Sequence, residues 1–190
     1  MHREPIEQVP AIVPFDGIWL EPGRPSKKEE QATWERLVHR LWERGVKVES
    51  ELQAIVRDAS RGLEQALDYV YGSSLVQQRC IFHKLRNVSN KCVGLDREGK
   101  KSFMEQAAAV YQARSAPEAR ARLAAFAEHW RAPQPQAVAT FERESEQTIR
   151  CYSLEGMVRE VVRTNRELRR KLRQVGCFSS PKGAEVAVYI

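Results

Sequence analysis

The chain has 190 residues, of which 42% are hydrophobic and 29% charged, enough for one domain with a buried core and at most an appendage. Its net charge of +6 favours a polyanionic partner, and no run approaches the roughly 20 apolar residues of a membrane-spanning helix. The four cysteines suggest a reducing compartment, and the first ten residues lack the apolar region of a signal peptide. We therefore expect a cytoplasmic protein with no membrane segment.

The first half of the chain alternates short apolar runs with helical patterns, as α/β folds do. Apolar runs that predict strands occupy residues 11–20, 52–57 and 75–82. Two amphipathic helical patterns begin at Ser26 and Ser60 and end at Gly45 and Gly72. Pro14 lies in the first run, and because proline has no backbone N–H, this run does not suit a fully paired central strand.

The second half is helical in pattern, and its composition changes near residue 95. Two alanine-rich, charged patterns span residues 100–114 and 117–131, and a last helical pattern spans 157–174. Between them, a helix that begins at Gln136 is predicted to turn these side chains inward: Val138, Phe141, Thr148, Ile149 and Tyr152. The tryptophans Trp34, Trp42 and Trp130 are expected to be core residues rather than base-stacking groups.

Asp16 and Asp58 each follow an apolar run that predicts a strand. Carboxylates at the ends of adjacent strands can converge on divalent metal ions, and oxygen ligands suit Mg²⁺ or Mn²⁺. Two such ions about 3.5–4 Å apart can activate a hydroxyl and stabilise the leaving oxygen in phosphodiester chemistry. The alternative is that both aspartates are ordinary strand-end or helix-capping residues.

Residues 78–87, with the sequence QRCIFHKLRN, combine Cys80 and His83 with the cations Lys84 and Arg86. A structural zinc site is one interpretation, but such a site needs four ligands, normally as two close pairs. Further candidates stand singly along the chain, at His39, Cys92, His129, Cys151 and Cys177. A buried thiol beside a capping histidine is the other plain interpretation.

The same string resembles the QRCxxHKxRN signature of Mutator-type transposases, a large bacterial insertion-sequence family. Other segments are similar to that family in the same order: a DG pair at Asp16, D-x-x-x-GL at Asp58, and NRELRRK at residues 165–171. The resemblance covers about residues 11 to 190. It implies an α/β fold with an RNase H-like core and a large all-helical insertion.

The resemblance also implies a domain order and a site. The expected parts are an N-terminal tail (1–10), the first part of the core (11–94), the helical insertion (95–153) and a basic helix that returns to the core (154–190). Asp16 and Asp58 would belong to an Asp, Asp, Glu triad that binds Mg²⁺ or Mn²⁺, while Cys80 and His83 shape the site beside them. An intact relative would bind its element's ends as an oligomer, then cut DNA and join it to a target.

Two departures from the family pattern weaken that site. The segment before Ser26 has no room for two strands that the family places there, so the core strands are expected to be incomplete. The chain also reads VVRTNRELRRK where the family has about seven more residues, roughly two helical turns, that include its catalytic glutamate. On a regular helix Glu160 points about 200° away from the glutamate position, now Val162, and is a weak substitute. We therefore expect a truncated, catalytically inactive copy.

Residues 157–174 carry seven cations against Glu160 and Glu167. Such a helix could place its apolar stripe on the core and offer its arginines to phosphates, although most charge-rich helices are solvated surface helices. The cations that we expect to contact DNA are Lys84, Arg86, Arg166, Arg169, Arg170, Lys171 and Arg173.

The expected function is that of a transposase-family protein of a mobile insertion element, with DNA as partner and a possible homo-oligomer or association with an intact transposase. One alternative is a non-catalytic DNA-binding or oligomerising remnant. Another is a helical interaction module with no nucleic-acid role. Salt-dependent DNA binding separates the last alternative from the others, and metal-dependent nicking separates the first two.

Overall fold

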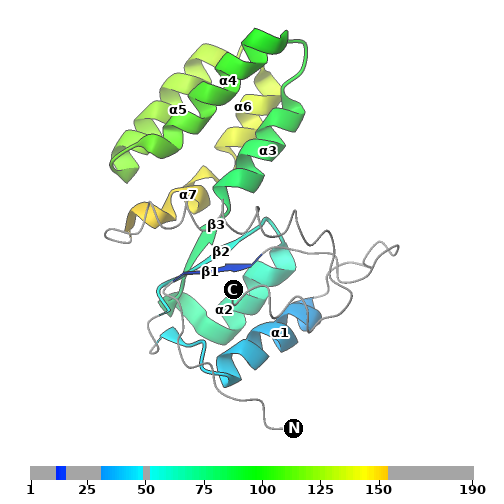
Figure 1. Cartoon of the computed structure of the whole chain (residues 1–190), viewed down its shortest axis with the longest axis vertical. Helices are drawn as coiled ribbons and strands as arrows, with labels where there is room; N and C mark the ends of the chain where they lie inside the picture. The colour runs from blue at the N-terminus through cyan, green and yellow to red at the C-terminus, as the bar shows by residue number, and fades with distance from the viewer. Residues whose placement is uncertain (1–11, 16–30, 49–51, 154–190) are drawn as a thin grey trace. The chain divides into compact units, whose positions relative to one another are not determined.

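The computed structural model describes residues 12–15, 31–48 and 52–153 (Figure 1). The predictions for Asp16, Glu160 and the cations of the 157–174 helix lie outside these residues. The described chain divides into two compact units, one that runs up to Gln78 and one that begins at Arg79. No helix in the described ranges is long and apolar enough to cross a membrane.

A small sheet forms the centre of the first unit, and its strand order is β1–β2–β3. The strands are β1 (Ile12–Phe15), β2 (Ala54–Arg57) and β3 (Val76–Arg79). β1 and β2 are parallel, with Ile12 opposite Ala54 and Phe15 opposite Arg57. β1 ends the order, which suits Pro14 because a proline has no backbone N–H to donate to a neighbouring strand.

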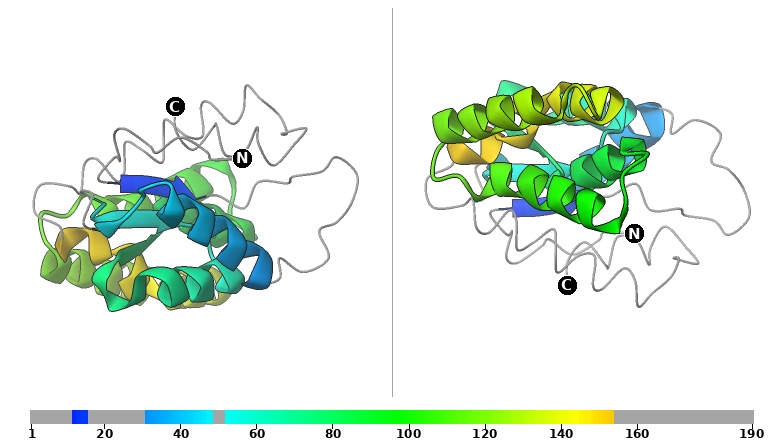
Figure 2. Two further views of the ribbon diagram at one scale, coloured as in Figure 1. Left: turned by 90° about the horizontal axis from the view of Figure 1, so that it is seen from below. Right: turned by 90° about the horizontal axis from the view of Figure 1, so that it is seen from above.

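Helices α1 (Gln31–Glu43) and α2 (Arg61–Tyr71) pack against each other in this unit (Figure 2). Ser60 caps α2 as predicted, because its side-chain oxygen accepts from the N–H of Leu63, and the helix ends at Gly72. The phenol of Tyr71 donates to the carbonyl of Val46 at 2.7 Å and so ties the end of α2 to the segment after α1. The cap and the glycine were visible in the sequence, and both boundaries are confirmed.

One apolar core holds the first unit together. Ile55 of β2 lies in the same cluster as residues of both helices, so α1 and α2 cover one face of the strand. The buried cluster consists of Val38, Leu41, Val46, Leu52, Ile55, Leu63, Ala66, Leu67, Tyr71 and Leu75. Trp34 packs against this cluster, as expected, whereas Trp42 is 37% exposed and stacks under the ammonium of Lys47 at 4.0 Å. The prediction that Trp42 is a core residue is therefore wrong.

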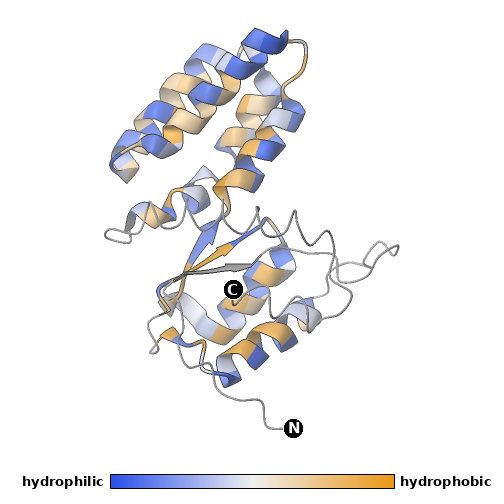
Figure 3. Cartoon of the chain, viewed as in Figure 1, coloured by the Kyte–Doolittle hydropathy of each residue, from blue (hydrophilic) through white to orange (hydrophobic). Residues whose placement is uncertain are grey.

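The second unit is helical, and hydrophobic and hydrophilic residues alternate along its helices (Figure 3). They are α3 (Ile81–Lys91), α4 (Arg97–Ala109), α5 (Ala116–Trp130), α6 (Pro135–Glu142) and the single turn α7 (Ser145–Thr148). Phe103 is at the centre, with ring centroids 5.0 Å from both Phe126 and Trp130, and Phe126 lies 5.2 Å from Phe141. Trp130 is thus a core residue, as predicted.

The structure corrects two predicted elements. The apolar run at residues 75–82 is a strand only to Arg79, and its last residues belong to helix α3. The reason is that Ile81, Leu85 and Val88 follow one another at helical spacing. The helix predicted from Gln136 is interrupted at Glu144, which has a left-handed backbone with φ of 54°. Of its predicted inward residues, Val138, Phe141, Thr148 and Ile149 are nevertheless buried, and Tyr152 is partly buried.

Candidate functional site

The strands that precede the two predicted catalytic aspartates are parallel neighbours. β1 ends at Phe15 and β2 ends at Arg57, and these two residues are opposite each other in the register. Asp58 follows Arg57 directly, and Asp16 follows Phe15 directly in the sequence but lies outside the described residues. Because parallel strands end at the same edge of a sheet, the last residues of β1 and β2, Phe15 and Arg57, lie side by side at that edge.

Asp58 occupies the turn between the end of β2 and the start of α2. Its Oδ1 accepts a hydrogen bond from the backbone N–H of Ser60 at 2.8 Å, while Ser60 itself caps α2. This local bond fixes one carboxylate oxygen of a partly buried side chain. Within the part of the chain that the structure describes, no hydrogen bond engages the other oxygen, Oδ2.

The last residue of β2, Arg57, is 1% exposed, and its buried side chain stabilises this turn by hydrogen bonds. Its Nε donates to Oε1 of Gln77 at 2.8 Å, and its Nη1 donates to the backbone carbonyl of Asp58 at 3.0 Å. Its Nη2 forms an ion pair with Glu64 of α2. Gln77 in turn donates to Asp68 of α2 at 2.7 Å. These bonds connect β2, α2 and β3 in one polar network around the buried Arg57 and Gln77.

The network leaves the carboxylate of Asp58 available for another cation. Arg57 touches Asp58 at its backbone carbonyl, and the guanidinium charge is balanced by Glu64. An aspartate oxygen without a protein donor is a suitable ligand for Mg²⁺ or Mn²⁺, which prefer carboxylate oxygens. Asp58 therefore fits such an ion in its chemistry. No group of three or more His, Cys, Asp or Glu side chains that could hold a metal occurs among the described residues.

Sequence reasoning missed the Arg57 network. A cation at the end of an otherwise apolar strand was its one visible signal, since a buried guanidinium needs partners. Those partners come from Glu64 and Gln77, which are polar residues with nothing unusual in their local pattern.

The signature at residues 78–87 is built into the second unit at the start of α3. Cys80 is buried at the N-cap position of that helix, and His83 packs edge-on against Phe82, with ring centroids 5.6 Å apart. The thiols of Cys80, Cys92 and Cys151 are buried and form no disulfides. That Cys80 and His83 shape a site beside Asp58 stays a prediction.

Two cations of the signature make internal contacts in the second unit. Arg79 forms an ion pair with Glu144, and the ammonium of Lys84 donates to the carbonyl of Arg143. Lys84 is 2% exposed, and burial, followed by the charge of Arg79, lowers the pKa of its ammonium to about 8. These contacts fasten the segment after α6, residues 143–144, to Arg79 and to α3. In this structure Lys84 therefore faces the protein interior, whereas Arg86 is exposed and faces solvent.

The comparisons with known proteins agree with the motif order. The model of the family described as "Transposase, Mutator family" matches residues 17–190. The chain belongs to the Mutator family of transposases. This family match covers Asp58, the signature at residues 78–87 and the NRELRRK segment together.

Three transposases of insertion sequences are similar to this Mutator-family chain. That of IS905 from Lactococcus lactis is 30% identical over 103 residues, 54% of this chain and 25% of the relative. That of IST2 from Acidithiobacillus ferrooxidans is 26% identical over 125 residues, which are 66% of this chain and 40% of the relative. That of ISRM5 from Rhizobium meliloti is 28% identical over 158 residues, which are 80% of this chain and 38% of the relative. The chain therefore spans well under half the length of each of these relatives.

Proposed function

We propose that this Mutator-family chain is the metal-holding and DNA-contacting part of an insertion-sequence transposase. The observation that carries the proposal is the register of β1 and β2, in which Phe15 and Arg57 are opposite each other. Each residue is followed by an aspartate, Asp16 or Asp58. Two carboxylates that leave one sheet edge on adjacent parallel strands are a suitable pair to share divalent ions.

The proposed core is RNase H-like. In such a core the strand that precedes the first catalytic aspartate lies beside, and parallel to, the strand that precedes the second. The parallel pair β1 and β2, and β3 as the third strand of the order, support this assignment. The helical second unit then corresponds to the all-helical insertion of the family.

In this proposal the protein's own residues position the carboxylate of Asp58. The N–H of Ser60 holds Oδ1 and Arg57 holds the backbone carbonyl, so Oδ2 would be the oxygen that ligates a divalent ion. Mg²⁺ or Mn²⁺ bound to Asp16 and Asp58 would activate a hydroxyl and stabilise the leaving oxygen in phosphodiester cleavage and joining. Arg166, Arg169, Arg170, Lys171 and Arg173 are proposed to bind DNA phosphates.

We further propose that the chain by itself binds DNA but does not cleave it. The family's catalytic glutamate has no counterpart in the VVRTNRELRRK segment, where Val162 stands at its position. Misplacement of reacting groups by about 1 Å can cost roughly 10²-fold in rate, so loss of a whole ligand is expected to abolish turnover. The chain would then act as a DNA-binding partner, alone, as an oligomer or together with an intact transposase.

Metal binding provides the direct test. Titration of Mn²⁺ into the chain, followed by electron paramagnetic resonance, measures free and bound metal without any need for activity. We expect Asp58→Asn to weaken Mn²⁺ binding at least tenfold. Asp96→Asn is the matched control, because Asp96 caps α4 through the N–H of Gly99 and asparagine caps a helix equally well. Equal affinity in the wild type and both variants would refute the metal site.

Nicking of supercoiled DNA in Mg²⁺ or Mn²⁺ tests the second half of the proposal. We expect none above the background of the Asp58→Asn variant. Strong nicking that Asp58→Asn abolishes would show that the chain is catalytic as written, and would make Glu160 the first candidate for the third ligand.

A further inference from the structure

Helix α3 has an unusual charge composition for a surface helix. Its eleven residues, Ile81–Lys91, include the cations Lys84, Arg86 and Lys91 and the imidazole of His83, but no acidic residue. Surface helices usually intersperse acids with their cations, because pairs three or four residues apart stabilise an isolated helix. The outward side of α3 therefore carries uncompensated positive charge.

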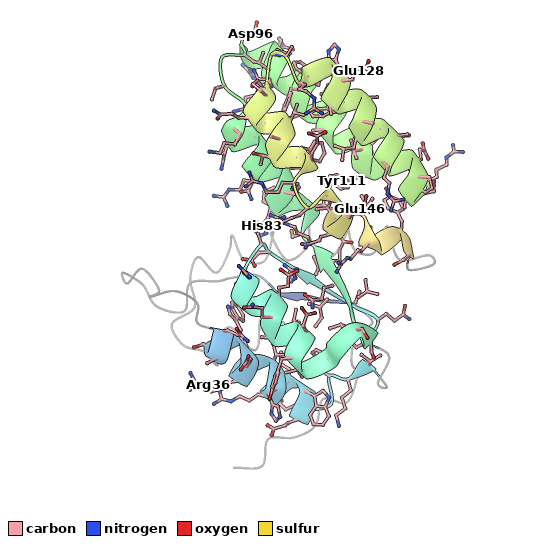
Figure 4. The ribbon with its side chains drawn as sticks, turned by 180° about the vertical axis from the view of Figure 1, so that it is seen from behind. Arg36, His83, Asp96, Tyr111, Glu128 and Glu146 are labelled. Atoms are coloured by element: carbon pink, nitrogen blue, oxygen red, sulfur yellow. The ribbon has the colours of Figure 1, made fainter. Side chains whose placement is uncertain are left out.

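The exposed polar residues of α3 share one side of the helix. Arg86, Asn87, Asn90 and Lys91 are all exposed, and at about 100° per residue they fall within an arc of about 140°. The buried residues Ile81, Lys84 and Val88 lie within about 60°, centred about 120° away. His83, which is partly buried at the N-terminal end of α3 (Figure 4), falls inside the exposed arc. We name the four exposed residues the α3 basic face.

Two other exposed arginines of the same unit, Arg120 and Arg131, are already neutralised. Arg120 forms a two-pronged contact with Glu146 at 2.9 and 2.8 Å, and Arg131 does the same with Glu142 at 3.1 and 2.7 Å. In the described part of the chain, by contrast, neither Arg86 nor Lys91 forms an ion pair. The difference between these two pairs of cations is not exposure but the presence of a carboxylate partner.

We infer that the α3 basic face binds the phosphate backbone of duplex DNA. Arg86 and Lys91 are about 7.5 Å apart along the helix axis, so each can contact its own phosphate, since a DNA strand carries one charge per 3.4 Å. Asn87 and Asn90 add amide groups that donate to phosphates and can reach base edges. The choice of DNA as the polyanion rests on the proposed function.

The signature at residues 78–87 thereby divides into two parts with different roles. Arg79 and Lys84 make the internal contacts that fix α3 to the Glu144 segment. Arg86 and Asn87 belong to the α3 basic face, which continues beyond the signature to Asn90 and Lys91. The buried residues of the signature thus fix α3 in the fold, and its exposed residues contact DNA.

The salt dependence of DNA binding tests this inference with a charge-matched control. The first variant is Arg86→Ala with Lys91→Ala, and the control is Arg120→Ala with Arg131→Ala; each loses two exposed positive charges from the second unit. Binding of a fluorescent duplex of arbitrary sequence is followed by anisotropy over a series of salt concentrations. Far-UV circular dichroism checks that both variants keep their helices, and Gln replaces Ala if either does not.

The slope of log K against log salt is expected to become shallower by about 1.8 in the first variant, since each lost phosphate contact removes about 0.9. The control is expected to keep the wild-type slope. A first variant with the wild-type slope, or two variants with equal changes, would overturn the inference while DNA binding itself still stood. A wild-type chain that does not bind duplex DNA even at low salt would refute the proposed function as well.

Discussion

Among substitutions of polar residues in the first unit, Arg57→Met should destabilise the unit most. Methionine fills a similar length of the buried site but cannot donate to Gln77, to the Asp58 carbonyl or to Glu64. The side chain of Arg57 is only 2% exposed, so water cannot take over these bonds without opening the unit. The buried amide of Gln77, 4% exposed, is left with an acceptor that has lost its charged donor.

The expected cost follows from the exposure of each partner. Loss of a hydrogen bond from a charged group to a buried acceptor costs about 1.5–3 kcal/mol, which applies to Gln77. Glu64 is 32% exposed and recovers water, so loss of its ion pair adds at most about 1 kcal/mol. The lost bond to the Asp58 carbonyl is partly offset by the apolar packing of methionine. We expect about 3 kcal/mol in total, or a roughly 150-fold larger population of the open unit.

Hydrogen exchange followed by mass spectrometry measures this opening in each unit separately. Peptides that cover β2 and α2 should exchange roughly 150-fold faster in Arg57→Met, as expected for about 3 kcal/mol. Peptides from α5 in the second unit should keep their wild-type rates. Arg61→Met is the matched control, because Arg61 is exposed at the start of α2 and its loss should change stability by less than about 0.5 kcal/mol. Equal rates in the two variants would show that the buried network does not stabilise the unit.

Two further predictions concern the second unit. Lys84→Met should flatten the rise of its free energy of unfolding between about pH 8 and 10.5, compared by urea denaturation. In that window the unfolded chain binds more protons than the folded one, because burial lowers the pKa of Lys84 in the folded state. This group therefore makes the stability of the wild type increase with pH. A variant with the wild-type pH profile would contradict the lowered pKa of Lys84. Phe141→Ala should cost about 3–5 kcal/mol, since the ring is fully buried against Phe126, and should accelerate hydrogen exchange in α5 but not in α2. Equal acceleration in both helices would contradict separate opening of the two units.

The elements whose signals are local could be predicted from the sequence. α2 was recognisable because Ser60 offers a capping oxygen, Leu63, Ala66 and Leu67 follow at helical spacing, and Gly72 permits the positive φ at the end. The strand before Asp58 was recognisable as a short apolar run, and it is a strand buried along its whole length. Membership of the Mutator family was predicted from the order of the motifs, and the family match over residues 17–190 confirms it.

The positions that sequence reasoning misjudged depend on partners far along the chain. Lys84 has the composition of a surface cation, but a carbonyl 59 positions away accepts from its ammonium and makes its burial possible. Glu144 adopts a left-handed backbone that a non-glycine residue rarely takes, and its ion pair with Arg79 accompanies that break in the helix. Periodicity tells which side of a helix is apolar, but whether a charged residue turns inward is decided by what the rest of the fold places opposite it. The sequence alone thus determined the family and the elements whose signals are local. The tertiary structure decided which of the described cations turn inward, as Lys84 does, and which face solvent, as Arg86 does.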